Sequence, residues 1–275
     1  HVAAALGREL VLQLHAVGTG ALQRAYGVTH IEGVAEPGVG IDDQRQALDR
    51  IADAQDTLRC WDLNTGAELY TVPCKAPGST PHNGSRMPVT LRGNHAYGVG
   101  PLGDCYSFDI EKHELVWRRN LPADFKIDLT RTNESMWGMA QAPLLYKDKL
   151  IVSLQCADKS MAALNPDTGA TLWTAEKLGY QDYTMPSVLT VDGKEQLVMA
   201  GGAKAHLRAA PTGTIGGIDP DDGKLLWSGK DLWSCYTPVA PPVVLPGGRF
   251  ALSGGYDAGT ALFQVTHDGG QYAVK

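Results

Sequence analysis

A nine-residue phrase recurs four times in the chain and constrains the fold more than any other feature. The copies are DLNTGAELY from Asp62, DIEKHELVW from Asp109, NPDTGATLW from Asn165 and DPDDGKLLW from Asp219. Their first residues are 47, 56 and 54 positions apart. A phrase that returns at such a period is typical of a repeat architecture, in which each copy marks one structural unit. Residues that recur in register are therefore expected to serve the fold, and residues outside the register are better candidates for function.

Each position of the phrase has a physical role in a tight turn. The Asp or Asn at the first position can accept hydrogen bonds from backbone N–H groups two residues on. Glycine at the fifth position supplies a positive φ, although the second copy has His113 there. The aromatic residue at the ninth position is a large apolar anchor between neighbouring sheets. The residues assigned to this structural role are Asp62, Gly66, Tyr70, Asp109, Trp117, Asn165, Gly169, Trp173, Asp219, Gly223 and Trp227.

The sequence around the phrase predicts strands. Two apolar runs, separated by a Gly- or Asp-containing turn, follow each of Pro88, Pro143, Pro186 and Pro242, which predicts a β-hairpin. A third strand leads into the phrase and a fourth strand ends it. Four strands in units of this length predict an all-β fold, a β-propeller of four-stranded antiparallel blades. A parallel α/β fold is disfavoured because no helical segments separate the strands.

The number of phrases predicts about five blades in this chain. Besides the four clear copies, a degraded fifth copy, VTHDGGQYAV, starts at Val265. It aligns Gly270 with Gly223 and Val274 with Trp227. An arc of five blades would leave sheet edges exposed. We therefore expect the ring to be incomplete in this chain.

Residues 1–57 do not contain the repeat. Apolar residues near helical spacing predict a helix from Ala3 to His15, ended by Gly18 and Gly20. The acidic, Ala-rich stretch over residues 41–55 is a candidate for a second, short helix. The chain is therefore divided into an irregular or helical N-terminal segment, residues 1–57, and propeller repeats, residues 58–275.

Charge and cysteine content exclude several classes of function. The net charge of -6 argues against a broad nucleic-acid-binding face. No run of 18 apolar residues occurs, so we expect no membrane span in this chain. The five cysteines form no CxxC pair, which disfavours a zinc ribbon, an iron–sulfur run and a c-type haem site. Isolated buried thiols are favoured over a disulfide.

The pattern D-x-x-T-G-x-x-x-W resembles the tryptophan-docking repeat of the PQQ-like, or quinoprotein-like, bacterial β-propeller family. The resemblance covers residues 58–275 and is strongest in DTGATLW and DDGKLLW. The repeats are also similar to those of the outer-membrane assembly lipoprotein. The resemblance implies a ring of seven or eight blades, of which this chain holds only a part. It also implies a periplasmic or otherwise extracytoplasmic location in the bacterial envelope.

The resemblance also raises the question of a quinone site. Quinoprotein dehydrogenases of this family hold pyrroloquinoline quinone (PQQ) between a tryptophan and a disulfide of adjacent cysteines, beside a calcium or lanthanide ion. This chain has no adjacent cysteine pair. The acids Asp219, Asp221 and Asp222 resemble a calcium loop in spacing, but the other copies of the phrase lack them. We therefore predict no catalytic residue, no metal ligand and no cofactor.

Polar and aromatic residues outside the phrase cluster just before the hairpins. We call these stretches the approach segments: residues 80–86, 133–137, 180–183 and 233–236. In a propeller these segments converge at one end of the blades, where they would form a binding mouth. Two alternatives remain open: the polarity reflects solvation, and the tryptophans pack in the core. The candidate ligand- or partner-binding residues are His82, Arg86, Trp137, Gln181, Asp182, Tyr183, Trp233 and Tyr236.

These observations predict a non-catalytic scaffold that binds a protein or a small ligand outside the cytoplasm. A protein partner is expected, either singly or within a larger envelope assembly, and nucleic acid is not. The alternative is a PQQ-dependent dehydrogenase that oxidises alcohols or sugars, and only this alternative requires PQQ with calcium.

Overall fold

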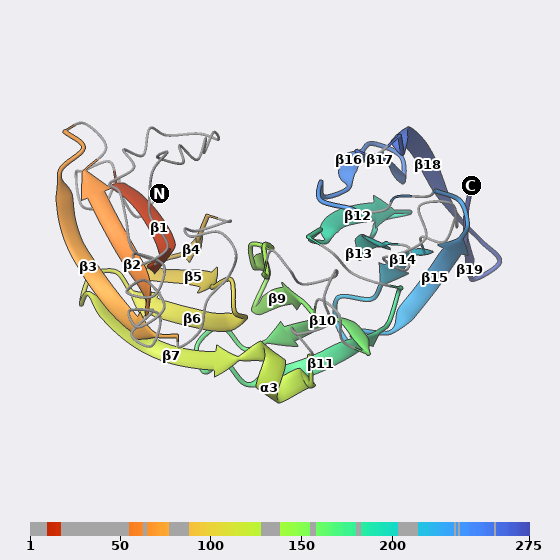
Figure 1. Cartoon of the computed structure of the whole chain (residues 1–275). Coiled ribbons are helices and arrows are strands. Elements are labelled where there is room, and N and C mark those ends of the chain that lie inside the picture. Colours follow the sequence, from red (N-terminus) through yellow and green to blue (C-terminus); the bar gives the residue numbers. More distant parts are fainter. Residues whose placement is uncertain are drawn as a thin grey trace.

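The computed structural model describes residues 10–17, 55–62, 65–76, 88–127, 138–154, 158–179, 183–202, 214–233, 235, 237–255 and 257–275, and for residues 10–17 it describes only the backbone. Five antiparallel sheets follow one another along the chain in an open arc (Figure 1). We call them blades 1 to 5, and blades 2 to 5 have four strands each. The architecture confirms the predicted all-β propeller of four-stranded antiparallel blades.

Within each blade the strands pair with their neighbours in chain order, from the inner side of the arc to its outer side (Figure 1). Blade 1 comprises β1 (Leu10–Val17), β2 (Gln55–Asp62) and β3 (Glu68–Lys75). Blade 2 comprises β4 (Thr90–Arg92), β5 (His95–Val99), β6 (Asp104–Asp109) and β7 (Glu114–Asn120), and the short helix α3 (Leu121–Phe125) follows it. Blade 3 comprises β8 (Leu144–Tyr146), β9 (Lys149–Ser153), β10 (Lys159–Leu164) and β11 (Thr171–Glu176). Blade 4 comprises β12 (Ser187–Val191), β13 (Lys194–Gly201), β14 (Thr214–Ile218) and β15 (Leu225–Lys230). Blade 5 comprises β16 (Val243–Leu245), β17 (Arg249–Gly254), β18 (Gly259–Asp268) and β19 (Gln271–Val274).

The N-terminal segment contains a strand where a helix was predicted. Leu10–Val17 form β1, which pairs along its whole length with β2, from Leu10 opposite Asp62 to Val17 opposite Gln55. The helix prediction for this stretch is therefore wrong. Residues 1–9 and residues 41–54 of the second predicted helix, at 41–55, lie outside the described residues, and Gln55 begins β2. The reason is tertiary. The edge of β2 offers a row of unpaired N–H and C=O groups, and pairing with it outweighs a weak helical pattern.

The predicted hairpins are confirmed in all four positions. Left-handed residues at the turns allow the two strands of each hairpin to reverse directly. They are Gly93, Lys147, Asp192 with Gly193, and Gly247 with Gly248, all with φ between 48° and 77°. Among the described residues, no helix is long and apolar enough to cross a membrane.

The core lies between the blades. In blade 3, Leu150 and Val152 pack toward blade 2, while Ile151 and Met161 pack toward blade 4. Successive residues of one strand point to opposite faces of the sheet, so both faces of β9 and β10 are buried. This explains why the middle strands read as continuous apolar runs rather than as alternating ones.

Blade 5 differs because only one of its faces is covered. Phe250 and Phe263 pack against blade 4 with their rings 5.1 Å apart, while their neighbour Leu262 on the opposite face is 60% exposed. Val243, in the same cross-strand row as Leu262, is also 60% exposed. The arc therefore ends in a sheet with an apolar strip on its uncovered face.

Candidate functional site

The structure places two of the eight candidate binding residues, Tyr183 and Trp233. The other six, His82, Arg86, Trp137, Gln181, Asp182 and Tyr236, lie outside the described residues. Their convergence in a binding mouth stays a prediction.

Residues at and just after the last two approach segments lie side by side. The backbone N–H of Tyr183 donates to the carbonyl of Pro238 at 3.1 Å. The next residue, Thr184, donates its hydroxyl to the carbonyl of Ala240 at 3.2 Å and accepts a hydrogen bond from Ser153 of blade 3 at 3.2 Å. Thr184 thus joins three consecutive blades.

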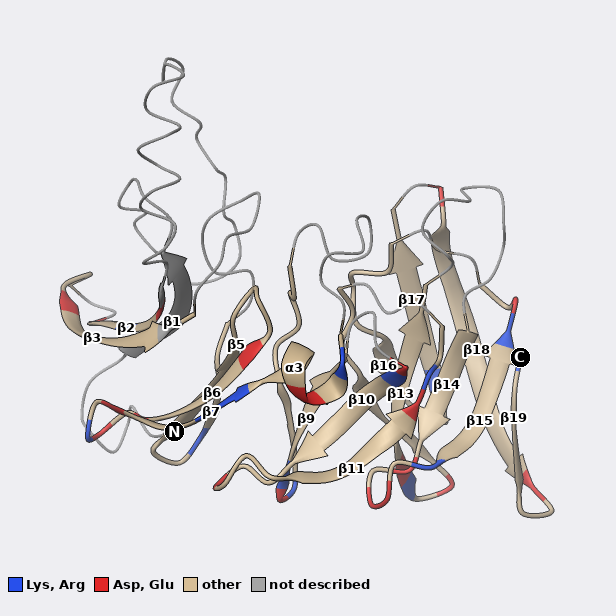
Figure 2. Cartoon of the chain, turned by 60° about the horizontal axis from the view of Figure 1, so that its bottom comes forward, with Lys and Arg blue, Asp and Glu red and all other residues tan. Residues whose placement is uncertain are grey.

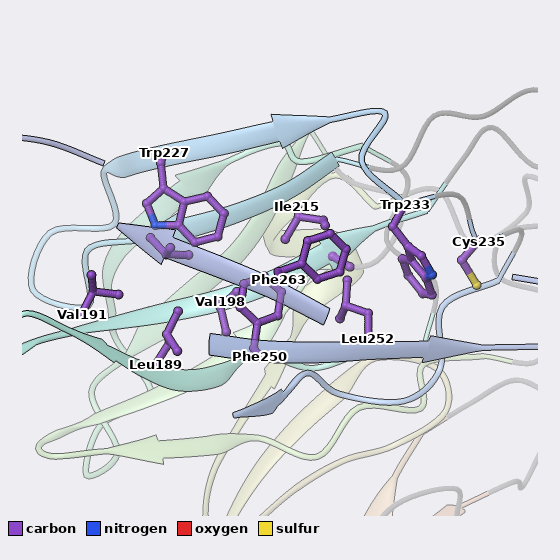
Figure 3. Packing of buried hydrophobic residues seen from close by; sticks show 12 residues of the cluster. Leu189, Val191, Val198, Ile215, Trp227, Trp233, Cys235, Phe250, Leu252 and Phe263 are labelled. Atoms are coloured by element: carbon purple, nitrogen blue, oxygen red, sulfur yellow. The ribbon is translucent and has the colours of Figure 1, made fainter. Parts of the chain in front are cut away.

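Trp233 lies in the core between blades 4 and 5. It is 8% exposed and belongs to the cluster that contains Cys235 and Leu252 (Figure 3). Gly254 makes room for it, since a Cβ there would lie 2.5 Å from the Cys235 sulfur and 3.1 Å from Trp233 Cζ2. Of the two readings of this tryptophan, ligand contact or packing, its burial favours packing.

The phrase forms the same closed turn in each of its four clear copies. The side chain at the first position accepts hydrogen bonds from backbone N–H groups two or three residues on: Asp62 from Thr65 at 2.9 Å, Asn165 from Asp167 at 2.9 Å and Asp219 from Asp221 at 2.8 Å. Asp109 accepts from Glu111 and Lys112, and the N–H of Lys112 is the main cause that lowers the pKa of its carboxyl.

A bulge at the eighth position directs the aromatic residue toward the next blade. In blade 3, Trp173 is opposite Ala163 but Thr171 is opposite Leu164, so Leu172 has no partner in the ladder. The same register shift leaves the eighth residue of the phrase without a partner in blades 1, 2 and 4, where it is Leu69, Val116 and Leu226. A bulge bends the strand and re-aims its side chains. The bulged residue is exposed in blades 1, 2 and 3, and Leu172 is 47% exposed, whereas Leu226 of blade 4 is partly buried.

In blades 1 to 3, the aromatic residue of the phrase donates a hydrogen bond to the second residue of the next phrase. Trp117 Nε1 donates to the carbonyl of Pro166 at 2.8 Å, and Trp173 Nε1 donates to that of Pro220 at 3.2 Å. The Tyr70 hydroxyl reaches the carbonyl of Ile110 at 3.3 Å. This repeated contact connects blades 1 to 4 through one backbone group per junction.

Glycine at the fifth position lets the indole approach the turn closely. A Cβ on Gly223 would lie 2.6 Å from Trp173 Cε3, and a Cβ on Gly169 would lie 3.0 Å from Trp117. His113 takes the place of glycine in blade 2, with φ of 57°, and its ring stacks on Tyr70 at 3.8 Å between centroids. The smaller tyrosine leaves space for a side chain, which explains the departure from glycine.

The junction between blades 4 and 5 is built differently. The Trp227 ring is buried over Gly217 of its own blade, and its Nε1 donates to Gln196 Oε1 at 2.6 Å. The fifth copy has a two-residue turn, Gly269–Gly270, in place of the closed turn. The ring of Trp227 still packs against Phe250 of blade 5, at 6.2 Å between centroids (Figure 3). Alignment of the phrase places Trp227 in the same position as Tyr70, Trp117 and Trp173, so the sequence could not show that its contacts differ.

Ion pairs bridge the blades at the end where the phrases lie. Arg92 of the blade 2 hairpin pairs with Asp167 of the third phrase at 3.0 Å, and Lys149 of the blade 3 hairpin pairs with Asp221 of the fourth phrase at 3.8 Å. Figure 2 shows charged residues at these turns in the lower part of the view. The acids at the third position of the phrase thus face cations of the preceding blade, which gives the calcium-like spacing around Asp219 a structural role.

Two of the described tryptophans have structural roles that do not fit a PQQ site. Trp117 and Trp173 are engaged at blade junctions through both ring face and N–H. Cys60, Cys74 and Cys105 are buried free thiols, as predicted, and Cys74 and Cys105 lie in the cores of two different junctions. No group of three or more His, Cys, Asp or Glu residues in the described part of the chain is arranged to hold a metal.

The fold and its repeated docking define a β-propeller of the PQQ-like repeat class. The family described as "Outer membrane protein assembly factor BamB" matches residues 54–256, and this chain belongs to that family. No curated protein matches the chain.

Solved structures give the same fold. BamB from Moraxella catarrhalis is 18% identical with a TM-score of 0.50, and the match covers 82% of this chain and 62% of that one. A chain of the mitotic checkpoint complex is 8% identical with a TM-score of 0.52, and the match covers 81% of this chain and 59% of that one. Quinohemoprotein alcohol dehydrogenase from Comamonas testosteroni is 14% identical with a TM-score of 0.49, and the match covers 81% of this chain and 40% of that one. The chain thus matches less than two thirds of the length of each.

Proposed function

We propose that this protein is a non-catalytic scaffold of the bacterial envelope, located outside the cytoplasm, and that it binds another protein through its approach segments. Membership of the BamB family over residues 54–256 is the observation that carries the proposal. The family description implies a part in outer-membrane protein assembly, within a larger assembly of subunits.

The distribution of polar groups supports this reading. The acids, glycines and tryptophans of the phrase form turns and contacts between blades. The end of each blade where the phrase lies therefore holds neighbouring blades together. The described residues just before the hairpins of blades 4 and 5, such as Thr184 and Ala240, lie at the other end, and the sequences of the approach segments vary from blade to blade. Loops that are positioned by a rigid scaffold are where propellers bind their partners.

Site-specific photo-crosslinking in the source bacterium tests the proposal. A photoreactive residue at Arg86, Gln181 or Tyr236 should form a specific adduct with an envelope protein, whereas one at Lys112 or Thr168, in the phrase turns, should not. Deletion of the gene should lower the fraction of newly made outer-membrane protein that reaches its folded form. Adducts of equal yield at both ends would contradict an approach-segment site.

Enzyme assays separate the scaffold from the dehydrogenase alternative. Purified protein incubated with PQQ and calcium should not reduce an artificial dye in the presence of alcohols or sugars. Substrate-dependent dye reduction, lost when calcium is chelated, would contradict the proposal.

A further inference from the structure

The junction between blades 1 and 2 buries two carboxyl groups beside an arginine whose side chain is 35% exposed. Asp56, on β2, is 3% exposed, and Asp104, on β6, is 2% exposed. Arg118, on the neighbouring strand β7, is the basic group that lies with them. A buried charge that is not paired is strongly unfavourable, so the question is which carboxyl group the arginine neutralises.

Arg118 forms its ion pair with Asp104. Asp104 Oδ1 accepts from Arg118 Nε at 2.9 Å and from the terminal guanidinium nitrogen at 2.9 Å, and it also accepts from Asn120 Nδ2 at 3.0 Å. These three donors come from β7 of the same blade. The Asp104–Arg118 pair is therefore internal to blade 2 and does not require blade 1.

Asp56 crosses the junction without a cation of its own. Its Oδ2 accepts from the Tyr106 hydroxyl at 2.8 Å. Its carboxylate lies so close to Gly100 that a Cβ there would collide with it. Within the part of the chain that the structure describes, no Lys, Arg or His lies within ion-pair distance of Asp56.

We propose that Asp56 makes the contact between blades 1 and 2 a proton-dependent latch, which is tight when the carboxyl group is protonated and loosens when it ionises. Protonated Asp56 is a neutral group that fits the apolar junction and keeps its contact with Tyr106. Ionised Asp56 places a second negative charge beside Asp104 in a site with one arginine.

The groups that face Asp56 have opposing effects on its pKa, and burial decides the direction. Burial is the main cause that raises the pKa of Asp56 to about 6; Asp104 raises it further, while Tyr106 and Arg118 lower it. Burial also raises the pKa of Cys74, on β3, to about 12 and that of Tyr106 above its usual range. A pKa of about 6 means that the carboxyl group of Asp56 ionises as the pH rises from 5 to 7.

The sign follows from the raised pKa. The carboxyl group of Asp56 holds its proton more tightly in the folded junction than in the unfolded chain. The stabilisation of the junction by protonated Asp56 is therefore complete below about pH 4 and is lost as the pH rises through about 6. Loosening would expose the apolar residues that blades 1 and 2 share, among them Leu58, Val72 and Phe108.

Cysteine labelling measures the latch directly. Cys74 is buried in the blade 1–2 junction and Cys105 in the blade 2–3 junction, and burial raises the pKa of both thiols to about 12. Each labelling rate, read by peptide mass spectrometry, is divided by the rate for the unfolded chain at the same pH. We expect the Cys74 ratio to rise about tenfold from pH 5 to 7.5, and the Cys105 ratio to stay constant.

Three variants test whether Asp56 causes the pH dependence of Cys74 labelling. Asp56→Asn should make the Cys74 ratio independent of pH, and Tyr106→Phe, which removes a bond that favours the charged form, should move the rise to higher pH. Asp268→Asn, an exposed acid at the far end of the arc, should behave like the wild type. A rise that persists in Asp56→Asn, or an equal rise at Cys105, would overturn the proposal.

Discussion

At the scale of the residue, the fifth position of the phrase shows how the absence of a Cβ atom lets neighbouring blades pack closely. Gly66, Gly169 and Gly223 all have φ near 70°, a region that glycine enters freely and other residues enter at a cost. Only the last two also lie under an indole of the preceding blade. The same residue type thus serves backbone geometry alone in one copy, and geometry together with docking in two others.

Substitution by alanine separates the two contributions. Gly66→Ala adds a Cβ that meets nothing within 4 Å, so we expect it to lower the free energy of unfolding by about 1 kcal/mol, the cost of the left-handed backbone. Gly223→Ala adds the same strain and also a contact of 2.6 Å with Trp173. We expect a further loss of about 2 kcal/mol from overpacking. Urea denaturation measures both, and equal losses would show that Trp173 moves away without penalty.

At the scale of the element, β18 has two neighbouring residues with opposite surroundings. Phe263 is 4% exposed and packs on blade 4, while Leu262 points to the uncovered face. The alternation of side chains along a strand produces this contrast. Blade 5 is thereby a two-sided element of which one side contributes to the core.

This asymmetry predicts different effects for two adjacent substitutions. Phe263→Ala removes a buried ring, and we expect it to lower the free energy of unfolding by about 3–5 kcal/mol. Leu262→Ser changes a side chain that is 60% exposed, and we expect a change of less than about 0.5 kcal/mol. Thermal or urea unfolding of the 275-residue chain is the measurement. A large loss for Leu262→Ser would mean that another surface covers this face in solution.

At the scale of the whole molecule, the arc is a row of blades, and the main contacts between blades in the described part of the chain join neighbours. Stability in such an architecture depends on the sum of nearest-neighbour junctions. Blades 3 and 4 have two covered faces each and blade 5 has one. Protection should therefore vary along the arc.

Hydrogen exchange of the native protein tests this gradient. Backbone amides of β10 and β14, buried on both faces of their sheets, should exchange at least about tenfold more slowly than those of β17 and β18. The comparison is made by mass spectrometry on peptides from each strand. Uniform protection from blade 3 to blade 5 would indicate that the arc unfolds as one cooperative unit.

The sequence determined the repeated parts of this protein, because they depend on local chemistry. An Asx turn, a left-handed glycine and an apolar strand need only neighbouring residues, so the blades, the hairpins and the role of Asn165 or Gly169 could be predicted. What lies outside the repeat depended on contacts distant in sequence. Leu10–Val17 are a strand because β2 offers a free edge, and Trp233 is buried because Gly254 leaves room for its ring. Trp227 has the same place in the phrase as Trp173, yet only the tertiary structure shows that it donates to Gln196, since the fifth copy has no closed turn to receive it. The pairing of Asp56 with Tyr106, 50 positions away, is likewise decided by the packing of one blade on the next.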